Sequence, residues 1–101
     1  FTYIDNVVHG NLLAADASGV EGRIINVANG KSISLLTLID ELNRLLGTNV
    51  APVHEAPRVG DVRDSMADIT LARTLLGYET QVDFQEGLER SIEYYRAMVT
   101  A

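Results

Sequence analysis

Cysteine and tryptophan are absent from this sequence of 101 residues, and only two prolines occur. Without cysteine the chain has no disulfide framework and no thiolate zinc site, which fits a reducing compartment. No run of about 18 apolar residues is present and no signal peptide is recognisable, so we expect neither a membrane span nor a membrane partner. These absences favour a cytoplasmic protein.

Positively charged residues are also scarce. Lysine and arginine number 8 against 14 aspartates and glutamates, which gives a formal net charge of −6. The mean field of such a chain repels phosphate, so we expect no general affinity for nucleic acid, and any anion must be bound locally. With 47% hydrophobic and 22% charged residues, the composition is that of one globular domain.

The first residues indicate that this domain comes from a longer protein. The chain begins at Phe1 within the apolar run FTYI, without a methionine or a polar lead. A natural domain seldom begins within a strand. We therefore expect residues 1–101 to be one part of a larger polypeptide.

The hydrophobic pattern predicts an α/β or α+β fold, with about four helices and short strands between them. Strands are expected at residues 1–4 and 23–28, and a short strand or an extended segment at 51–56. The apolar residues of 23–28 are contiguous rather than alternating, as in a strand covered on both faces of a parallel sheet. Helices are expected at residues 5–17, 35–46 and 69–76, and from Asp83 onward.

Local signals predict where these helices begin and end. N-terminal caps are expected at Asp5, Ser34, Asp68 and Asp83, the last in a capping box with Glu86. Gly47 and Gly77 are suited to end the second and third helices. Helical spacing predicts one apolar face on each of two helices. The first helix carries Val8, Leu12 and Ala15, and the last carries Phe84, Leu88, Ile92 and Tyr95.

Most side chains that could take part in catalysis or metal binding do not have the sequence spacing that such sites require. His9 and His54 are far apart, so no metal site is expected; we interpret His9 as a helix-surface residue and His54 as a strand residue with a local partner. The single lysine, Lys31, has no tyrosine four residues before it, so a Tyr-Lys catalytic pair is absent. Tyr94 and Tyr95 are interpreted as core residues. No glycine-rich phosphate loop occurs.

The segment APRVGDVRDSMAD, residues 56–68, is the exception. Arg58 and Arg63 lie five apart in a loop that Pro57 restricts and in which Gly60 permits a sharp turn, and Asp61, Asp64 and Asp68 follow. The arginines can pair with these aspartates, and such surface pairs contribute about 0–1 kcal/mol. Alternatively they form an anion site, because the planar guanidinium binds phosphate at two points. The spacing alone favours the ion pairs somewhat.

Four motifs in a fixed order support a family resemblance: FTYIDNVV, IINVANGKSISLLTLIDEL, APRVGDVRDSMADITLARTLLGYE and FQEGLERSIEYYR. Over essentially the whole chain they resemble the C-terminal part of the extended short-chain dehydrogenase/reductases, which have a Rossmann-type fold. The likeness is strongest to nucleotide-sugar 4-epimerases, such as UDP-glucose and UDP-N-acetylglucosamine 4-epimerases.

The resemblance implies roles for two residues. The R-x-G-D motif of the family matches residues 58–61, so Arg58 would bind the diphosphate of a UDP-sugar and Asp61 would contact the ribose. Arg63 occupies a commonly basic position, and no role is carried over to it. The glycine-rich NAD loop and the Tyr-x-x-x-Lys pair of the family lie in its N-terminal part, so no catalytic, cofactor-binding or metal-binding residue is expected in this chain.

The resemblance also implies a function. In such epimerases NAD takes hydride from C4 of the sugar, and the resulting keto sugar turns over while its nucleotide end is held. This chain would be the nucleotide-binding end and inactive alone. The alternatives are part of a nucleotide-sugar dehydratase or decarboxylase, or a non-catalytic binding module. We expect a homodimer of the full-length protein, and self-association of this chain through the open edges of strand 23–28.

Overall fold

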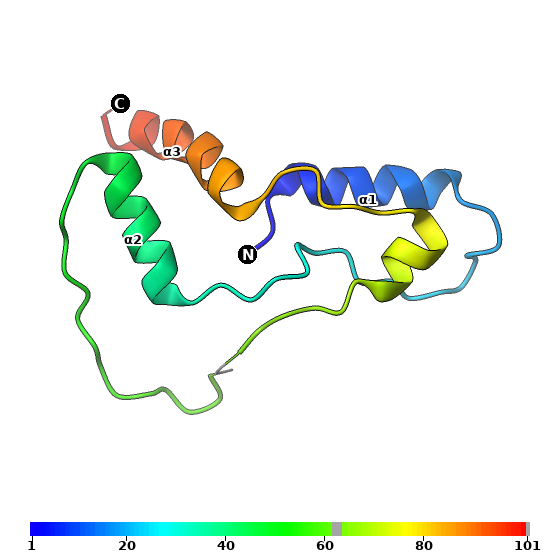
Figure 1. Cartoon of the computed structure of the whole chain (residues 1–101), viewed down its shortest axis with the longest axis horizontal. Coiled ribbons are helices and arrows are strands. Elements are labelled where there is room, and N and C mark those ends of the chain that lie inside the picture. The colour runs from blue at the N-terminus through cyan, green and yellow to red at the C-terminus, as the bar shows by residue number, and fades with distance from the viewer. Residues whose placement is uncertain (62–63, 101) are drawn as a thin grey trace.

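The computed structural model describes residues 1–61 and 64–100, which form helices joined by long extended segments. The helical elements are α1 (Ile4–Asp16), α2 (Leu35–Leu46), the π-helical turn η1 (Ala72–Leu76) and α3 (Phe84–Thr100). The molecule is flat, with extents of 49 × 35 × 20 Å. The helices form two pairs, because η1 packs beside α1 and α2 packs against α3 (Figure 1).

Local contacts determine both ends of α2, as predicted. Ser34 Oγ accepts a hydrogen bond from the backbone N–H of Thr37 at 3.1 Å. Gly47 ends the helix with a φ of 66°, a left-handed conformation that glycine adopts without the steric cost of a Cβ. Beyond it, Asn43 Nδ2 donates to the carbonyl oxygen of Val50 at 3.0 Å. These contacts fix the direction in which the chain leaves α2.

The predicted cap of α3 is confirmed: Asp83 Oδ1 accepts a hydrogen bond from the backbone N–H of Glu86 at 2.8 Å. This carboxylate satisfies a backbone donor that has no partner within the helix. Asp68 Oδ1 accepts from the backbone N–H of Thr70 at 2.9 Å, but the residue before η1 is Leu71, which makes no side-chain cap.

The main hydrophobic core lies between α1, η1 and the segment 20–28. Its buried members are Ile69, Ala72, Leu76 and Tyr78. Half-buried side chains that pack against them are Leu13, Ala17, Val20, Ile25, Val27 and Ala28. The Tyr78 hydroxyl donates to the carbonyl oxygen of Ala28 at 2.7 Å, so the polar end of this buried ring has a partner.

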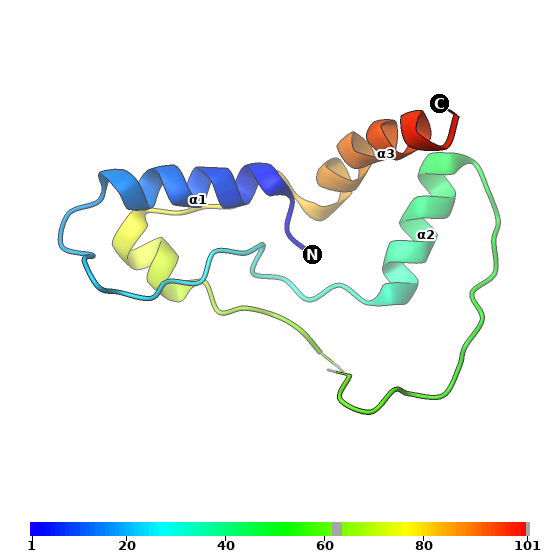
Figure 2. The ribbon, with the colours of Figure 1, turned by 180° about the vertical axis from the view of Figure 1, so that it is seen from behind.

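Asn6 is a buried polar residue that joins the start of α1 to the segment before α3. Its Nδ2 donates to the carbonyl oxygen of Val82 at 2.7 Å, and its Oδ1 accepts from the backbone N–H groups of Gln81 and Val82 at 2.8 and 3.0 Å. A Cβ added at Gly87 of α3 would lie 2.8 Å from the Cβ of Tyr3. These close contacts hold the N-terminal ends of α1 and α3 together, and Figure 2 shows the two ends meeting from the opposite side.

The predicted strands are the main error of the sequence analysis. Among the described residues no strand is formed: 23–28 is extended without a ladder, and Ile4 already belongs to α1. Residues 51–56 form an extended segment, which is one of the two predicted alternatives. Ile24 is 91% exposed, so 23–28 is not covered on both faces. A strand requires a neighbour for its backbone groups, and none lies beside these segments in the described part of the chain. The α/β or α+β prediction is therefore correct in its four helices only.

Two predictions about side chains are also wrong. The N-cap of α1 is Tyr3 rather than Asp5, which lies in the first turn. Val8 and Leu12, on the predicted apolar face of α1, are 47% and 66% exposed, because α1 turns toward the core with the side that carries Gly10 and Leu13. Tyr94 and Tyr95 are not core residues, because their side chains on α3 are 64% and 59% exposed.

Two classes of feature do not occur among residues 1–61 and 64–100. None of the helices in these ranges is long and apolar enough to cross a membrane. No three histidine, aspartate or glutamate side chains in them are grouped so that they could hold a metal ion.

Candidate functional site

The predicted R-x-G-D segment forms a tight turn on the long loop between α2 and η1. The backbone N–H of Asp61 donates to the carbonyl oxygen of Arg58 at 3.3 Å, which closes the turn. Gly60 has a φ of 88°, the conformation that the third residue of a type II turn requires. The motif therefore has a glycine at this position because the turn needs a positive φ there.

The turn brings the two predicted site residues together. Arg58 Nε donates to Asp61 Oδ2 at 3.2 Å, and the two side chains are 85% and 53% exposed. Such an exposed ion pair contributes about 0–1 kcal/mol, because water and salt screen it. No other hydrogen bond joins the Arg58 guanidinium to a described residue, so its Nη groups remain available. Arg63 lies outside the described residues.

A cavity of about 830 Å³ lies next to this loop. Its walls come from four parts of the chain: Phe1, residues 32–36 with Ile39, residues 52–54, and Asp64 with Ser65. The last of these lie shortly after the turn in sequence, whereas Arg58 and Asp61 do not line the cavity themselves. The turn itself is exposed to solvent, with the Arg58 side chain 85% exposed.

The cavity includes residues that the sequence analysis did not select. The N-terminal end of α2 contributes Ser34 and the preceding Ser32, while His54 lies on the opposite segment. His54 was predicted to be a strand residue, but its segment is extended without a ladder. Of these residues, the sequence analysis singled out Ser34, but only as an N-cap and not as part of a cavity. The convergence of these segments depends on tertiary structure and has no sequence pattern.

One carboxylate beside the loop has a shifted pKa. Hydrogen bonds from the hydroxyl and the backbone N–H of Thr70 hold the pKa of Asp68 below its usual value. Stabilisation of the charged form is the expected effect of such donors. The ionised form of Asp68 is therefore favoured where the loop leads into the segment before η1.

The sequence is similar to those of UDP-sugar epimerases. No family model matches the chain. It is 35% identical to a UDP-glucuronate 4-epimerase of Thermodesulfobacterium geofontis over 93% of this chain and 29% of that protein. It is 32% identical to a UDP-glucose 4-epimerase of Mycolicibacterium smegmatis over 95% of this chain and 30% of that protein.

Solved structures show the same likeness. The chain superimposes on a UDP-glucose 4-epimerase of Thermotoga maritima, solved with UDP-glucose, with a TM-score of 0.87 and 36% identity over 97% of this chain and 31% of that one. A mutant UDP-glucuronic acid 4-epimerase of Bacillus cereus, solved with a fluorinated UDP-glucuronic acid and NAD, gives a TM-score of 0.89 at 29% identity. That match covers 97% of this chain and 32% of the epimerase.

These comparisons confirm the predicted resemblance to the extended short-chain dehydrogenase/reductases. Within that class, the similarity is to nucleotide-sugar 4-epimerases that act on UDP-sugars. The chain spans only 29% and 30% of the length of the two curated relatives described above. The chain is thus similar to one part of these enzymes.

Proposed function

We propose that this chain is the part of an NAD-dependent UDP-sugar 4-epimerase that holds the nucleotide diphosphate. The observation that carries the proposal is the exposed Arg58–Asp61 turn, on the same loop that lines a cavity with Asp64 and Ser65, in a chain similar to epimerases solved with UDP-sugars. Arg58 would bind the diphosphate and Asp61 a ribose hydroxyl. This assignment develops the R-x-G-D match found in the sequence.

The observed ion pair is compatible with this role. A diphosphate offers the Arg58 guanidinium two negatively charged acceptors, which bind an arginine fork better than one carboxylate does. The existing pair is exposed and contributes about 0–1 kcal/mol, so its exchange costs little. Asp61 is released by the same exchange and can accept a hydrogen bond from a hydroxyl.

NAD does not fit the residues of this chain. The sequence has no glycine-rich dinucleotide loop and no tyrosine four residues before Lys31. No step of hydride or proton transfer is therefore assigned to its side chains. Their role is to hold the nucleotide at a place remote from the reacting sugar carbon, as an epimerase requires while the sugar turns. We expect this chain alone to show no turnover of UDP-glucose.

Two alternatives to an epimerase remain. A nucleotide-sugar dehydratase or decarboxylase would use the same diphosphate site, whereas a binding or assembly module would leave Arg58 in its ion pair. The names of the relatives favour the epimerase. For the full-length protein we propose a homodimer.

A nuclear magnetic resonance titration tests the proposal. UDP and inorganic pyrophosphate are each added up to millimolar concentration, and backbone amide signals are followed. Both should shift the signals of residues 58–61 and 64–65, since both carry the diphosphate. If these signals stay unchanged while the protein is folded, the diphosphate assignment is wrong.

A further inference from the structure

One asparagine of this chain is followed by glycine, at Asn29 and Gly30. The backbone nitrogen of the next residue can attack the side-chain amide of an asparagine, and a glycine has no side chain that blocks this approach. The other asparagines precede valine, leucine or arginine, whose side chains hinder the attack. The sequence therefore makes Asn29 the most reactive asparagine of the chain.

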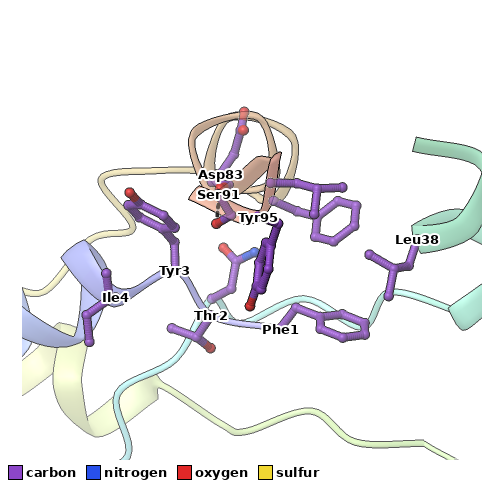
Figure 3. A pocket seen from close by; sticks show the side chains of 12 residues that line it. Phe1, Thr2, Tyr3, Ile4, Leu38, Asp83, Ser91 and Tyr95 are labelled. Atoms are coloured by element: carbon purple, nitrogen blue, oxygen red, sulfur yellow. Dashed lines mark hydrogen bonds between the residues drawn. The ribbon is translucent and has the colours of Figure 1, made fainter. Parts of the chain in front are cut away.

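Asn29 lies in the wall of a second cavity, with a volume of about 390 Å³. Figure 3 shows Phe1 and Tyr95 at this cavity, with Asp83 and Ser91 on the α3 side. Asn29 is only 6% exposed, yet no completely buried side-chain polar atom in the described part of the chain lacks a partner. Its amide therefore keeps a little accessible surface, through which water reaches it from the cavity.

Both groups that would react are free of hydrogen bonds. Among residues 1–61 and 64–100, the Asn29 side-chain amide has no partner and the backbone N–H of Gly30 donates to none. Asn6 differs, because three hydrogen bonds to backbone groups hold its amide in place. The amide of Asn29 can thus turn toward the Gly30 nitrogen without breaking a contact.

The fold itself requires the glycine that makes Asn29 reactive. Gly30 has a φ of 74°, a left-handed conformation that other residues rarely adopt. A Cβ at this position would lie 2.7 Å from Ile69 Cδ1 in the core. The reactive pair is therefore a consequence of the close packing between this segment and the residues before η1.

We infer that Asn29 is a site of spontaneous deamidation in the folded chain. The Gly30 nitrogen gives up its proton and forms a bond to Asn29 Cγ, while the bond from Cγ to the amide nitrogen breaks and ammonia leaves. Water from the cavity then opens the resulting succinimide ring at either carbonyl carbon, which gives aspartate or isoaspartate. The site uses neither Arg58 nor Asp61, so the inference goes beyond the proposed diphosphate site.

The products destabilise the surroundings of residue 29. Among the described residues, no lysine, arginine or histidine lines the cavity, and Asp83 already contributes a carboxylate to it. A second carboxylate there is nearly buried and unpaired, which is unfavourable. Isoaspartate also adds a carbon to the main chain between two contacts, the hydrogen bonds of the Tyr78 hydroxyl to the Ala28 carbonyl oxygen and of the Thr80 hydroxyl to the Asn29 carbonyl oxygen.

Mass spectrometry of one tryptic peptide tests the inference with an internal control. Cleavage after Arg23 and Lys31 releases residues 24–31, which contain both Asn29 and the exposed Asn26. After incubation of the folded chain at mildly alkaline pH, Asn29 should gain about 1 Da while Asn26 keeps its mass. Asn29→Gln should leave the peptide unchanged, because closure of the larger glutamine ring is slow. A gain on Asn26 that matches or exceeds that on Asn29 would overturn the inference.

The same incubation in guanidinium chloride separates the contribution of the fold from that of the sequence. If the chain reacted only after global unfolding, the folded protein would react about 10³-fold more slowly than the denatured one, or slower still. With both reacting groups free and a cavity beside them, we expect the folded chain to be slower by less than about a hundredfold. Slowing beyond that would show that the fold closes the reaction, and the inference would be wrong.

The variant Asn29→Asp tests the consequence directly, because it carries one of the two products. Its melting temperature should fall by more than about 4 °C, since the new carboxylate is nearly buried beside Asp83. Asn26→Asp, at an exposed position of the same segment, is the matched control and should change the melting temperature little. Equal melting temperatures of the two variants would overturn the claim that deamidation loosens this part of the fold.

Discussion

At the residue scale, the strongest constraint in this molecule is a polar side chain inside it. Asn6 is completely buried and makes three hydrogen bonds to backbone groups of residues 81 and 82. Nothing in the local sequence indicates this role, because the partners lie 75 and 76 positions away. The R-x-G-D turn, by contrast, depends on neighbours within three residues and could be predicted from its arginine, glycine and aspartate.

We expect Asn6→Ala to destabilise the chain by about 2–4 kcal/mol, because it leaves buried backbone donors and an acceptor unpaired. Asn11→Ala, at an exposed position of the same helix, is the control and should change stability by less than about 0.5 kcal/mol. Denaturant unfolding followed by circular dichroism measures both. Equal stability of the two variants would show that the Asn6 contacts contribute little.

At the element scale, helices were predictable and strands were not. The ends of α2 follow from Ser34 and Gly47, which act on backbone groups within one turn. The extended segment 23–28 has the composition of a strand, yet a strand also needs a partner that its own sequence does not specify. The segment packs on α1 through close side-chain contacts instead of a backbone ladder. A Cβ at Gly10 would lie 2.6 Å from Val27 Cγ1, so the two segments approach closely.

This close approach gives a prediction for Gly10→Ala. In an unpacked helix the change would stabilise by about 1 kcal/mol, since alanine is the better helix former. Here the methyl group overlaps Val27, so we expect a net destabilisation of about 1–3 kcal/mol. Val27→Ala in the same chain should recover part of the loss by making room. Thermal unfolding of the single and double variants measures this, and a higher melting temperature in Gly10→Ala alone would contradict the packing.

At the scale of the whole molecule, the chain leaves much apolar surface uncovered. Ile4, Val8 and Leu12 form a stripe along α1, and Ile24 is almost fully exposed. The flat shape arises because the two helix pairs share little core. The sequence analysis predicted self-association through open strand edges. The structure forms no strand among the described residues and exposes apolar side chains on a helix face instead.

We expect this surface to make the isolated chain self-associate, since exposed apolar patches favour association. Sedimentation velocity over a wide concentration range should show a rising average mass. Leu12→Asp should lower the association by placing a charge in the stripe, whereas Leu71→Asp, at an exposed residue outside it, serves as the control. A single monomeric species at all concentrations would refute the expectation.

The central claim is that Arg58 holds a diphosphate, and calorimetric titration of UDP into this chain tests it most directly. Charged hydrogen bonds contribute about 1.5–3 kcal/mol, so Arg58→Ala should weaken UDP binding about 10- to 150-fold. Arg58→Lys should restore part of the affinity, because an ammonium lacks the two-point contact, and Asp61→Asn should be milder. The control is Arg73→Ala, whose arginine is 56% exposed and paired with Glu79.

The melting temperature of each variant separates binding from stability. The account predicts that Arg58→Ala loses UDP affinity while its melting temperature changes little, and that Arg73→Ala keeps the affinity of the unaltered chain. If Arg58→Ala binds UDP as tightly as the unaltered chain does, Arg58 serves only its ion pair with Asp61 and the diphosphate site is not on this turn.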